Sequence, residues 1–228
     1  MRVTPGIAVV AGSTGLVGEQ LLPILAAAPE YDRVIALTRR PLPSPPARVK
    51  QRTVDFDRLD EVLDDLRDLG ERIDVFCCLG TTLRMAGSKS AFRRVDHDYV
   101  MALGRWAARV GARRVLLVSA LGADATSRVF YNQVKGETEA ALQSLRVNSL
   151  VIARPSLLDG DRFDLRIGER LAIIASRRLR ALIPERMRPI RAEDVAAALL
   201  LAARAAQPAP ILESAQMQGA AQQLADST

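Results

Sequence analysis

Residues 7–18 read Ile-Ala-Val-Val-Ala-Gly-Ser-Thr-Gly-Leu-Val-Gly, and this stretch decides the fold. Its first part, Ile7–Ala11, is a short apolar run typical of a buried strand. From Leu16 onward the apolar residues recur at helical spacing, so the stretch predicts a strand, a glycine-rich loop and a helix. This is the setting of a dinucleotide-binding loop, although the G-x-x-G-x-x-G spacing departs from G-x-G-x-x-G.

A glycine-rich loop between a strand and a helix can hold a diphosphate. The glycines allow a tight turn and a close approach of backbone to the anion, while the helix N-terminus offers unpaired N–H groups. A plain glycine turn without a ligand is the alternative. The candidate cofactor-binding residues of the loop are Gly12, Ser13, Thr14, Gly15, Leu16, Val17 and Gly18.

Strands and helices alternate along the following residues. Further strands are predicted at Arg33–Leu37, Val49–Val54, Ile73–Leu79, Val115–Val118 and Leu150–Ala153. Most of these runs are apolar nearly throughout, so we expect parallel strands that are buried on both faces. The sequence predicts an α/β protein with a doubly wound parallel sheet, which is a Rossmann fold of three α/β/α layers.

Helical periodicity predicts a long helix over Ser90–Val110, another over Ser127–Leu145 and a third over Ala192–Ala206. A chain of 228 residues with 49% hydrophobic and 25% charged residues is expected to form a single domain. Within it we expect a cofactor-binding core over 1–154, a small substrate-capping segment over 155–206 and a C-terminal tail over 207–228. The last ten residues of the tail are expected to be loose.

Composition argues against several classes of partner. The net charge of +6 comes from 29 arginines and 3 lysines without a dense basic tail, and aromatic residues make up only 4%, which disfavours nucleic acid. The longest apolar run, Val195–Ala203, is far below the roughly 18 residues of a membrane span. His97 is the sole histidine and lacks a metal-ligand pattern, so no metal is expected. The adjacent Cys77 and Cys78 favour a reduced, cytoplasmic protein.

The end of the second predicted strand reads Thr38-Arg39-Arg40. Sites that prefer NAD place an acidic residue there, which binds the ribose hydroxyls of the adenosine. The guanidinium groups of Arg39 and Arg40 can instead pair with the extra phosphate of NADP. The sequence therefore favours NADP(H) over NAD(H), with two solvated arginines on a loop as the alternative.

Three residues form a candidate catalytic set. Tyr131 and Lys135 are four apart on a predicted helix, so their side chains share one face. A tyrosine hydroxyl is a poor proton donor or acceptor at neutral pH until a nearby positive charge stabilises its phenolate. Ser119 ends a predicted strand and could hydrogen-bond a substrate carbonyl. A strand-end serine with a surface tyrosine and lysine is the alternative.

With these motifs the sequence resembles the short-chain dehydrogenase/reductase superfamily, in particular its atypical Tat-interacting-protein-like branch. That branch is related to the NAD-dependent epimerase/dehydratase and NmrA-like proteins. The resemblance covers roughly residues 5–215. The motifs that carry it are, in chain order, GSTGLVG, TRRPL, VDFDRL, DVFCCLGTT, FRRVDHDYV, RRVLLVSALGAD, FYNQVKGETE and ARPSLLDG.

The resemblance implies further site residues. It places Asp55 and Phe56 beside the adenine; it also implies that Ser119, Tyr131 and Lys135 are catalytic. The residues it places along the dinucleotide or near the nicotinamide are Leu79, Gly80, Thr81, Pro155 and Leu157. Related extended reductases often carry asparagine where this chain has Asp96, which puts a proton relay through that position in doubt.

Together these features predict an NADP(H)-dependent oxidoreductase that reduces a small-molecule carbonyl substrate. An NADP(H)-binding sensor or scaffold with negligible turnover is an alternative, and so is an enzyme of the epimerase or dehydratase kind. The identity of the substrate cannot be read from the sequence, because one fold and one cofactor site serve many substrates. A homodimer and a protein partner both stay open.

Overall fold

The computed structural model describes residues 6–64, 72–159 and 184–227. Its centre is a seven-stranded sheet of parallel strands in the order β3-β2-β1-β4-β5-β6-β9. The strands are β1 (Gly6–Ala11), β2 (Tyr31–Thr38), β3 (Val49–Thr53), β4 (Ile73–Cys77), β5 (Arg114–Val118), β6 (Leu150–Arg154) and β9 (Ile211–Glu213). The strand order reverses between β1 and β4, which is where open α/β sheets bind ligands. The predicted Rossmann fold is confirmed.

Apolar side chains on both faces of the sheet explain the parallel arrangement. In β1, Val9 pairs with Ile35 of β2 and with Val75 of β4, and every residue of β1 is buried. A strand buried on both faces needs a helix layer on each side. A further pair of short parallel strands, β7 (Leu158–Asp159) and β8 (Ile190–Arg191), lies apart from this sheet.

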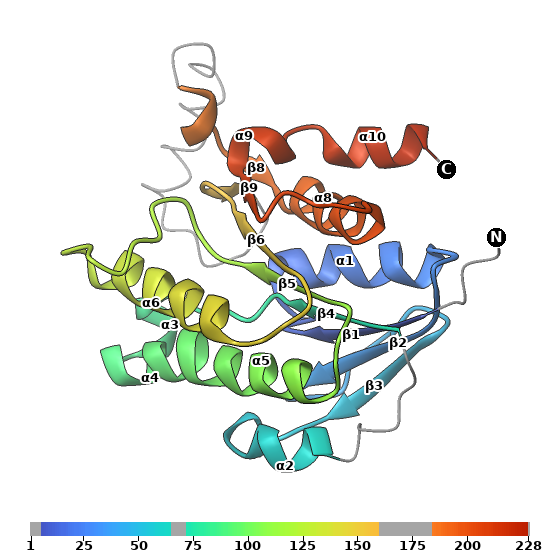
Figure 1. Ribbon diagram of the computed structural model, residues 1–228, viewed down its shortest axis with the longest axis horizontal. Helices are drawn as coiled ribbons and strands as arrows, with labels where there is room; N and C mark the ends of the chain where they lie inside the picture. The colour runs from blue at the N-terminus through green and yellow to red at the C-terminus, as the bar shows by residue number, and fades with distance from the viewer. Residues whose placement is uncertain (1–5, 65–71, 160–183, 228) are drawn as a thin grey trace.

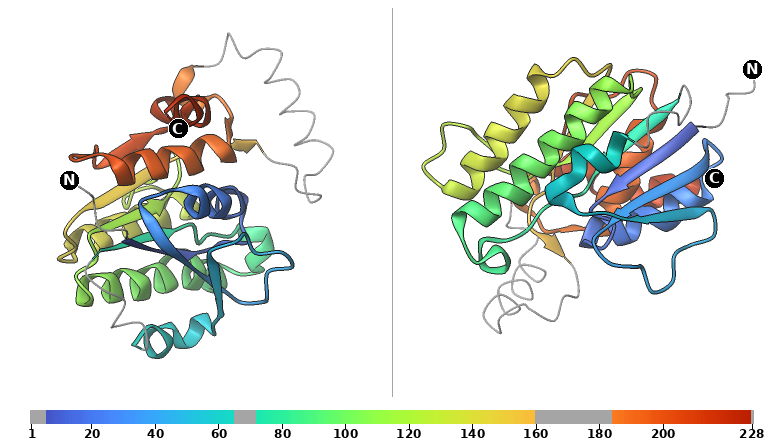
Figure 2. Two further views of the ribbon diagram at one scale, coloured as in Figure 1. Left: turned by 90° about the vertical axis from the view of Figure 1, so that its right-hand side faces the viewer. Right: turned by 90° about the horizontal axis from the view of Figure 1, so that it is seen from below.

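Helices cover both faces and complete three layers (Figure 1). Figure 2 shows the two helix layers, one on each face of the sheet, from the side and from below. On one face lie α1 (Leu16–Ala27), α8 (Ala192–Arg204), α9 (Ser214–Met217) and α10 (Ala220–Asp226). On the other face lie α2 (Leu59–Asp64), α5 (Tyr99–Arg109) and α6 (Phe130–Ser144). The described residues contain no helix that is long and apolar enough to cross a membrane.

The helix predicted over Ser90–Val110 is interrupted. It consists of α4 (Lys89–Arg93), a π-helical segment η2 (Arg94–Asp98) and α5. The Tyr99 N–H donates to the Arg94 carbonyl, which lies five residues back instead of four. Such π-helical turns are rare and occur frequently at functional sites. Asp96 is in the middle of this turn and is buried.

The prediction that the last ten residues are loose is wrong for the described residues, since Ala220–Asp226 form α10, and the residues before them are ordered as well. Ile211 and Leu212, the one apolar patch of that region, form β9 by pairing with Ile152 and Ala153 of β6. Farther on, α10 packs on α8, with Ala220 buried against the core. An alanine-rich segment has little periodicity to mark it as core, yet its small side chains let two helices pack closely.

The predicted substrate-capping segment is described only in part. The sequence also predicts a helix near Leu165–Ser176 in this segment, and that prediction lies outside the described residues. The last helix of the segment, α8, packs beside α1 against the sheet.

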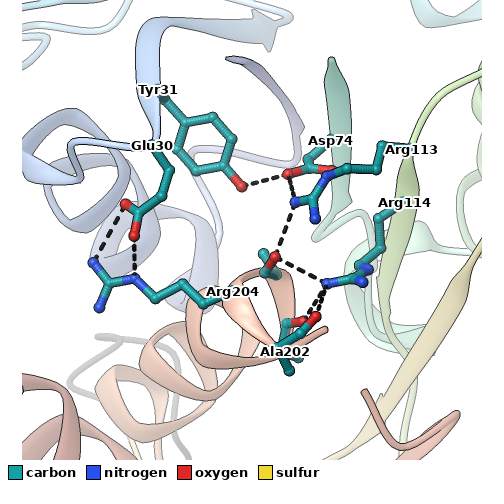
Figure 3. A network of polar contacts seen from close by, with 9 residues as sticks. Glu30, Tyr31, Asp74, Arg113, Arg114, Ala202 and Arg204 are labelled. Carbon is teal, nitrogen blue, oxygen red and sulfur yellow. Dashed lines mark hydrogen bonds and ion pairs between the residues drawn. The ribbon is translucent and has the colours of Figure 1, made fainter. Parts of the chain in front are cut away.

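A network of polar groups lies at the amino ends of the strands (Figure 3). The fully buried Asp74 of β4 accepts hydrogen bonds from the Tyr31 hydroxyl, at 2.7 Å, and from Arg113 Nε, at 2.9 Å. Arg113 also donates to the Ala203 carbonyl at 2.9 Å, and Arg114 to that of Ala202 at 2.5 Å. These arginines satisfy carbonyls of the last turn of α8 and so fix that helix to the sheet.

Candidate active site at the carboxyl ends of the strands

A cleft of about 330 Å³ opens at the carboxyl ends of β1, β2 and β4. The residues that line it are Gly12, Ser13, Thr14, Gly15, Leu37, Thr38, Arg39, Phe56, Cys78, Leu79, Gly80, Thr81, Met85, Ala86, Ala91, Val95 and Tyr99. They come from the end of β2, from the segments that follow β1, β2, β3 and β4, from the short helix α3 (Leu83–Ala86) and from the interrupted helix. The cleft thus coincides with the switch point of the sheet.

The glycine loop forms one wall of this cleft, and its three glycines serve different purposes. Gly12 has a φ of +83°, and a Cβ there would lie 2.3 Å from the Cys78 carbonyl oxygen. A Cβ on Gly18 would lie 2.2 Å from the Gly12 carbonyl oxygen, so both positions need glycine for the backbone itself to pack. Gly15 is less confined, because the nearest atom to its Cβ would be 3.2 Å away. Gly15 faces the cleft and ends the loop as the N-cap of α1.

The polar groups of this wall fit the diphosphate of a dinucleotide. The N-cap of α1 is Gly15, which has no side chain to cap the helix, so the first N–H groups of α1 can bind an anion. Ser13 and Thr38 also line the cleft, and their buried hydroxyls have no hydrogen-bond partner among the described residues. Buried polar groups are normally paired, so unpaired ones in a cleft point to a missing ligand.

An aromatic pair and an arginine also line the cleft. The rings of Phe56 and Tyr99 lie 5.6 Å apart, which offers an apolar surface to a flat base. The Tyr99 hydroxyl donates to Asp57 at 2.7 Å, and burial together with this carboxylate raises the pKa of Tyr99 to about 12. Arg39 follows β2 and lines the same cleft.

Lys135 lies directly behind the cleft wall. A Cβ placed on Gly80, which lines the cleft, would be 3.6 Å from Lys135 Nζ. The lysine is 6% exposed and its Nζ lies 2.8 Å from Asp96 Oδ1. Burial alone would lower the pKa of Lys135, but the Asp96 carboxylate and then Tyr131 outweigh it and raise that pKa above its ordinary value.

Tyr131 lies near Lys135, whereas Ser119 is hydrogen-bonded to a different residue, Glu139. The Tyr131 ring packs on Phe92 with centroids 5.4 Å apart, and its hydroxyl is close enough to act electrostatically on Lys135. Ser119 is buried and donates its proton to Glu139, one turn beyond Lys135 on α6. Glu139 is also paired with Arg154, whose Nε lies 3.1 Å from either carboxylate oxygen.

The other predicted residues lie outside the lining of the cleft. Leu16, Val17 and Gly18 begin α1, where Val17 and Gly18 are buried. Arg40 is exposed on the loop after β2, and Asp55 caps the 3-10 turn η1 (Phe56–Arg58) through the Asp57 N–H, at 3.0 Å. Pro155 and Leu157 follow β6, the first buried and the second exposed. Their assignments to a cofactor stay predictions.

Sequence reasoning missed part of the lining. Leu37, Thr38 and Cys78 adjoin predicted residues and could have been included from strand direction alone. Val95 and Tyr99 belong to a quoted motif, but only the fold shows that this helix borders the cleft. Met85 and Ala86 come from α3, a single turn that no periodicity marks.

Residues 8–136 match the NAD dependent epimerase/dehydratase family, and the chain belongs to this family of Rossmann proteins. Within it, protein HTATIP2 of Rattus norvegicus is 39% identical over 166 residues, which are 71% of this chain and 66% of that protein. Protein FMP52 of Eremothecium gossypii is 37% identical over 156 residues, or 68% and 67% of the two chains. The matched region spans about two thirds of the length of these relatives. The predicted family resemblance is confirmed.

Solved structures agree with this fold. MoeE5 in complex with UDP-glucose and NAD superposes with a TM-score of 0.69 at 20% identity, over 91% of this chain and 75% of that one. The enzyme WbmG of Bordetella bronchiseptica in complex with NAD superposes with a TM-score of 0.66 at 16% identity, over 92% and 72%. At such identities the likeness concerns the fold.

The prediction of a cytoplasmic location is contradicted. The FMP52 relatives of Eremothecium gossypii and Saccharomyces cerevisiae are both named as mitochondrial proteins. The inference came from two reduced cysteines, and cysteine usage indicates a redox environment without distinguishing one reducing compartment from another.

Proposed function

We propose that the chain is an NADP(H)-dependent oxidoreductase that reduces a small carbonyl compound, with Tyr131 as the proton donor. The observation that carries the proposal is the position of Gly80, which lines the cleft and lies against Lys135. A cofactor in the cleft would therefore lie next to the lysine. Tyr131, four residues earlier on α6, is close enough to interact with that lysine.

The residues of the chain have distinct tasks in this reaction. NADPH bound in the cleft would supply the hydride for the carbonyl carbon. Tyr131 gives its proton to the carbonyl oxygen and regains one from solvent, and the Lys135 ammonium stabilises the phenolate left behind. Lys135 also holds the ribose in this proposal, while Gly15 and the N-terminus of α1 hold the diphosphate.

The preference for NADP(H) rests on the end of β2. Arg39 lines the cleft there, and the next residue is a second arginine instead of a carboxylate. A guanidinium can pair with a phosphate on the ribose through charge-assisted hydrogen bonds. We assign this contact to Arg39 and a supporting role to the exposed Arg40.

Ser119 is proposed to orient the carbonyl, but its present contact also supports a second function. Its proton is donated to Glu139, so the hydroxyl must turn before it can donate to a substrate. That contact favours, as an alternative, an NADP(H)-binding regulator with negligible turnover. An epimerase or dehydratase that keeps its cofactor tightly bound is a third candidate, favoured by the family match.

A screen of small aldehydes and ketones for NADPH oxidation separates the reductase from the two other functions. The wild type should oxidise NADPH with some carbonyl compound, and Tyr131→Phe should lower that turnover by about 10²–10⁴ while NADPH affinity changes little. Ser119→Ala is the matched test of the serine and should lower turnover less. Tight NADPH binding with no turnover on any compound would exclude the reductase and leave the regulator and the epimerase or dehydratase.

A further inference from the structure

The π-helical turn η2 brings a carboxylate into the site that the proposed reaction does not use. Asp96 is 1% exposed and lies between two elements, the loop after β4 and helix α6. Its Oδ2 accepts a hydrogen bond from the Thr81 N–H at 2.9 Å, and its Oδ1 lies 2.8 Å from Lys135 Nζ. Thr81 lines the cleft, so one carboxylate connects the cleft wall with the lysine.

The backbone of this turn is also fixed. The Thr138 hydroxyl lies 3.0 Å from the Asp96 carbonyl oxygen and 2.8 Å from that of Val134, and it shares one proton between them. Thr138 and Lys135 are neighbours on α6, so the same face of that helix holds both the main chain and the side chain of Asp96.

Stability alone does not account for a buried ion pair. Removing two charges from water costs about as much as their attraction returns, so such pairs contribute little net stability. They do fix geometry, and titratable groups in such settings gather at functional sites. The other groups near the Lys135 ammonium are Tyr131 from α6 and the buried thiol of Cys77 from β4.

We propose that Asp96 is a positioning residue, whose carboxylate holds the Lys135 ammonium at a fixed place between the cleft wall at Thr81 and Tyr131. The proposal rests on the role assigned to Lys135 above. Asp96 itself needs no contact with substrate or cofactor. Its carboxylate acts through the lysine, and it takes no part in a proton relay.

The three lysines of the chain allow a direct test by NMR of their ¹⁵Nζ atoms, with titration and without any substrate. Lys50 and Lys89 are exposed and serve as internal references. In the wild type, Lys135 should stay protonated to a higher pH than both. In Asp96→Asn, which keeps an acceptor for Thr81, the Lys135 pKa should fall below that of the references, because burial remains and the carboxylate is gone.

Asp98→Asn is the matched control, since it makes the same chemical change on the same turn at an exposed side chain. It should leave the Lys135 titration unchanged. NADPH affinity should fall about tenfold in Asp96→Asn, the equivalent of about 1.4 kcal/mol, and should stay at the wild-type value in Asp98→Asn.

An unchanged Lys135 titration in folded Asp96→Asn would overturn the proposal, and so would a changed titration with unchanged NADPH affinity. If Asp96→Asn does not fold, the wild-type titration decides: a Lys135 that loses its proton before Lys50 and Lys89 contradicts the proposal. A chain that binds no NADPH at all would refute the proposed function, and the lysine titration would then still test the ion pair.

Discussion

The two ends of strand β4 differ in how their polar groups are satisfied. At the amino end, the Asp74 carboxylate is paired with Tyr31 and Arg113, and the network continues to the last turn of α8 (Figure 3). At the carboxyl end, the cleft has two buried hydroxyls, those of Ser13 and Thr38, without a partner among the described residues. Arg114 Nε at the amino end also has no hydrogen-bond partner among the described residues. The amino-end network nevertheless ties α8 to the sheet, whereas Ser13 and Thr38 line a cleft that can take a ligand.

The largest expected effect concerns the amino end. Asp74→Ala removes the buried carboxylate that pairs with Arg113 and the Tyr31 hydroxyl, so the free energy of unfolding should drop by about 3–5 kcal/mol. Urea denaturation measures it. Glu30→Gln, at the partly exposed pair with Arg204, is the control and should cost less. A loss below about 1 kcal/mol for Asp74→Ala would show that this network does not hold α8 to the sheet.

At the cleft, two glycines of one loop should respond differently. Gly18→Val forces a side chain against the Gly12 carbonyl and should destabilise the fold by about 1–3 kcal/mol or more. Gly15→Val should leave the protein folded but remove NADPH binding, because its branched side chain occupies the approach to α1. Circular dichroism and calorimetric titration measure the two effects. If folded Gly15→Val binds NADPH normally, the diphosphate lies elsewhere.

The carboxyl end of β4 should also be sensitive to alkaline pH. Burial raises the pKa of Cys77 to about 11, so its neutral thiol stabilises the fold below the ordinary thiol pKa. This contribution is lost as pH rises through about 11, because the buried thiol then loses its proton. Denaturation at pH 7 and pH 10 should show a smaller drop in stability for Cys77→Val than for the wild type. Equal drops would exclude Cys77 as a cause.

The smallest expected effect comes from the two unpaired hydroxyls. Ser13→Ala and Thr38→Val remove groups that bond nothing in the described structure, so stability should stay within about 0.5 kcal/mol of the wild type. Tyr31→Phe, at the paired end, should cost more. NADPH affinity should fall in Ser13→Ala and Thr38→Val. A clear loss of stability in either of these two variants would mean that the hydroxyl has a structural partner.

The sequence predicted the sheet well because strands buried on both faces leave long apolar runs, as in Ile7–Ala11 and Ile73–Cys77. It predicted the glycine loop because tight turns restrict residue type. It did not predict β9 or α10, whose order comes from pairing with β6 and packing on α8. Those contacts depend on partners distant in the chain.

Contacts in the candidate site were likewise predictable only where both residues lie on one element. Tyr131 and Lys135 share a helix, so their spacing alone brings them together. The pairing of Lys135 with Asp96 and of Ser119 with Glu139 joins separate elements, and no local pattern encodes it. The π-helical turn that buries Asp96 likewise leaves no trace in hydrophobic periodicity, which continues through Ser90–Val110 as if the helix were regular.

The most direct test of the account is calorimetric titration of the wild type and of an Arg39→Ala, Arg40→Ala double variant with NADPH and NADH. We expect one site per chain, tighter binding of NADPH than of NADH by the wild type, and loss of that preference in the variant. Absence of binding for both cofactors would contradict the claim that the cleft at the carboxyl ends of β1 and β4 is a dinucleotide site. Equal affinity for both cofactors in the wild type would contradict the role given to Arg39.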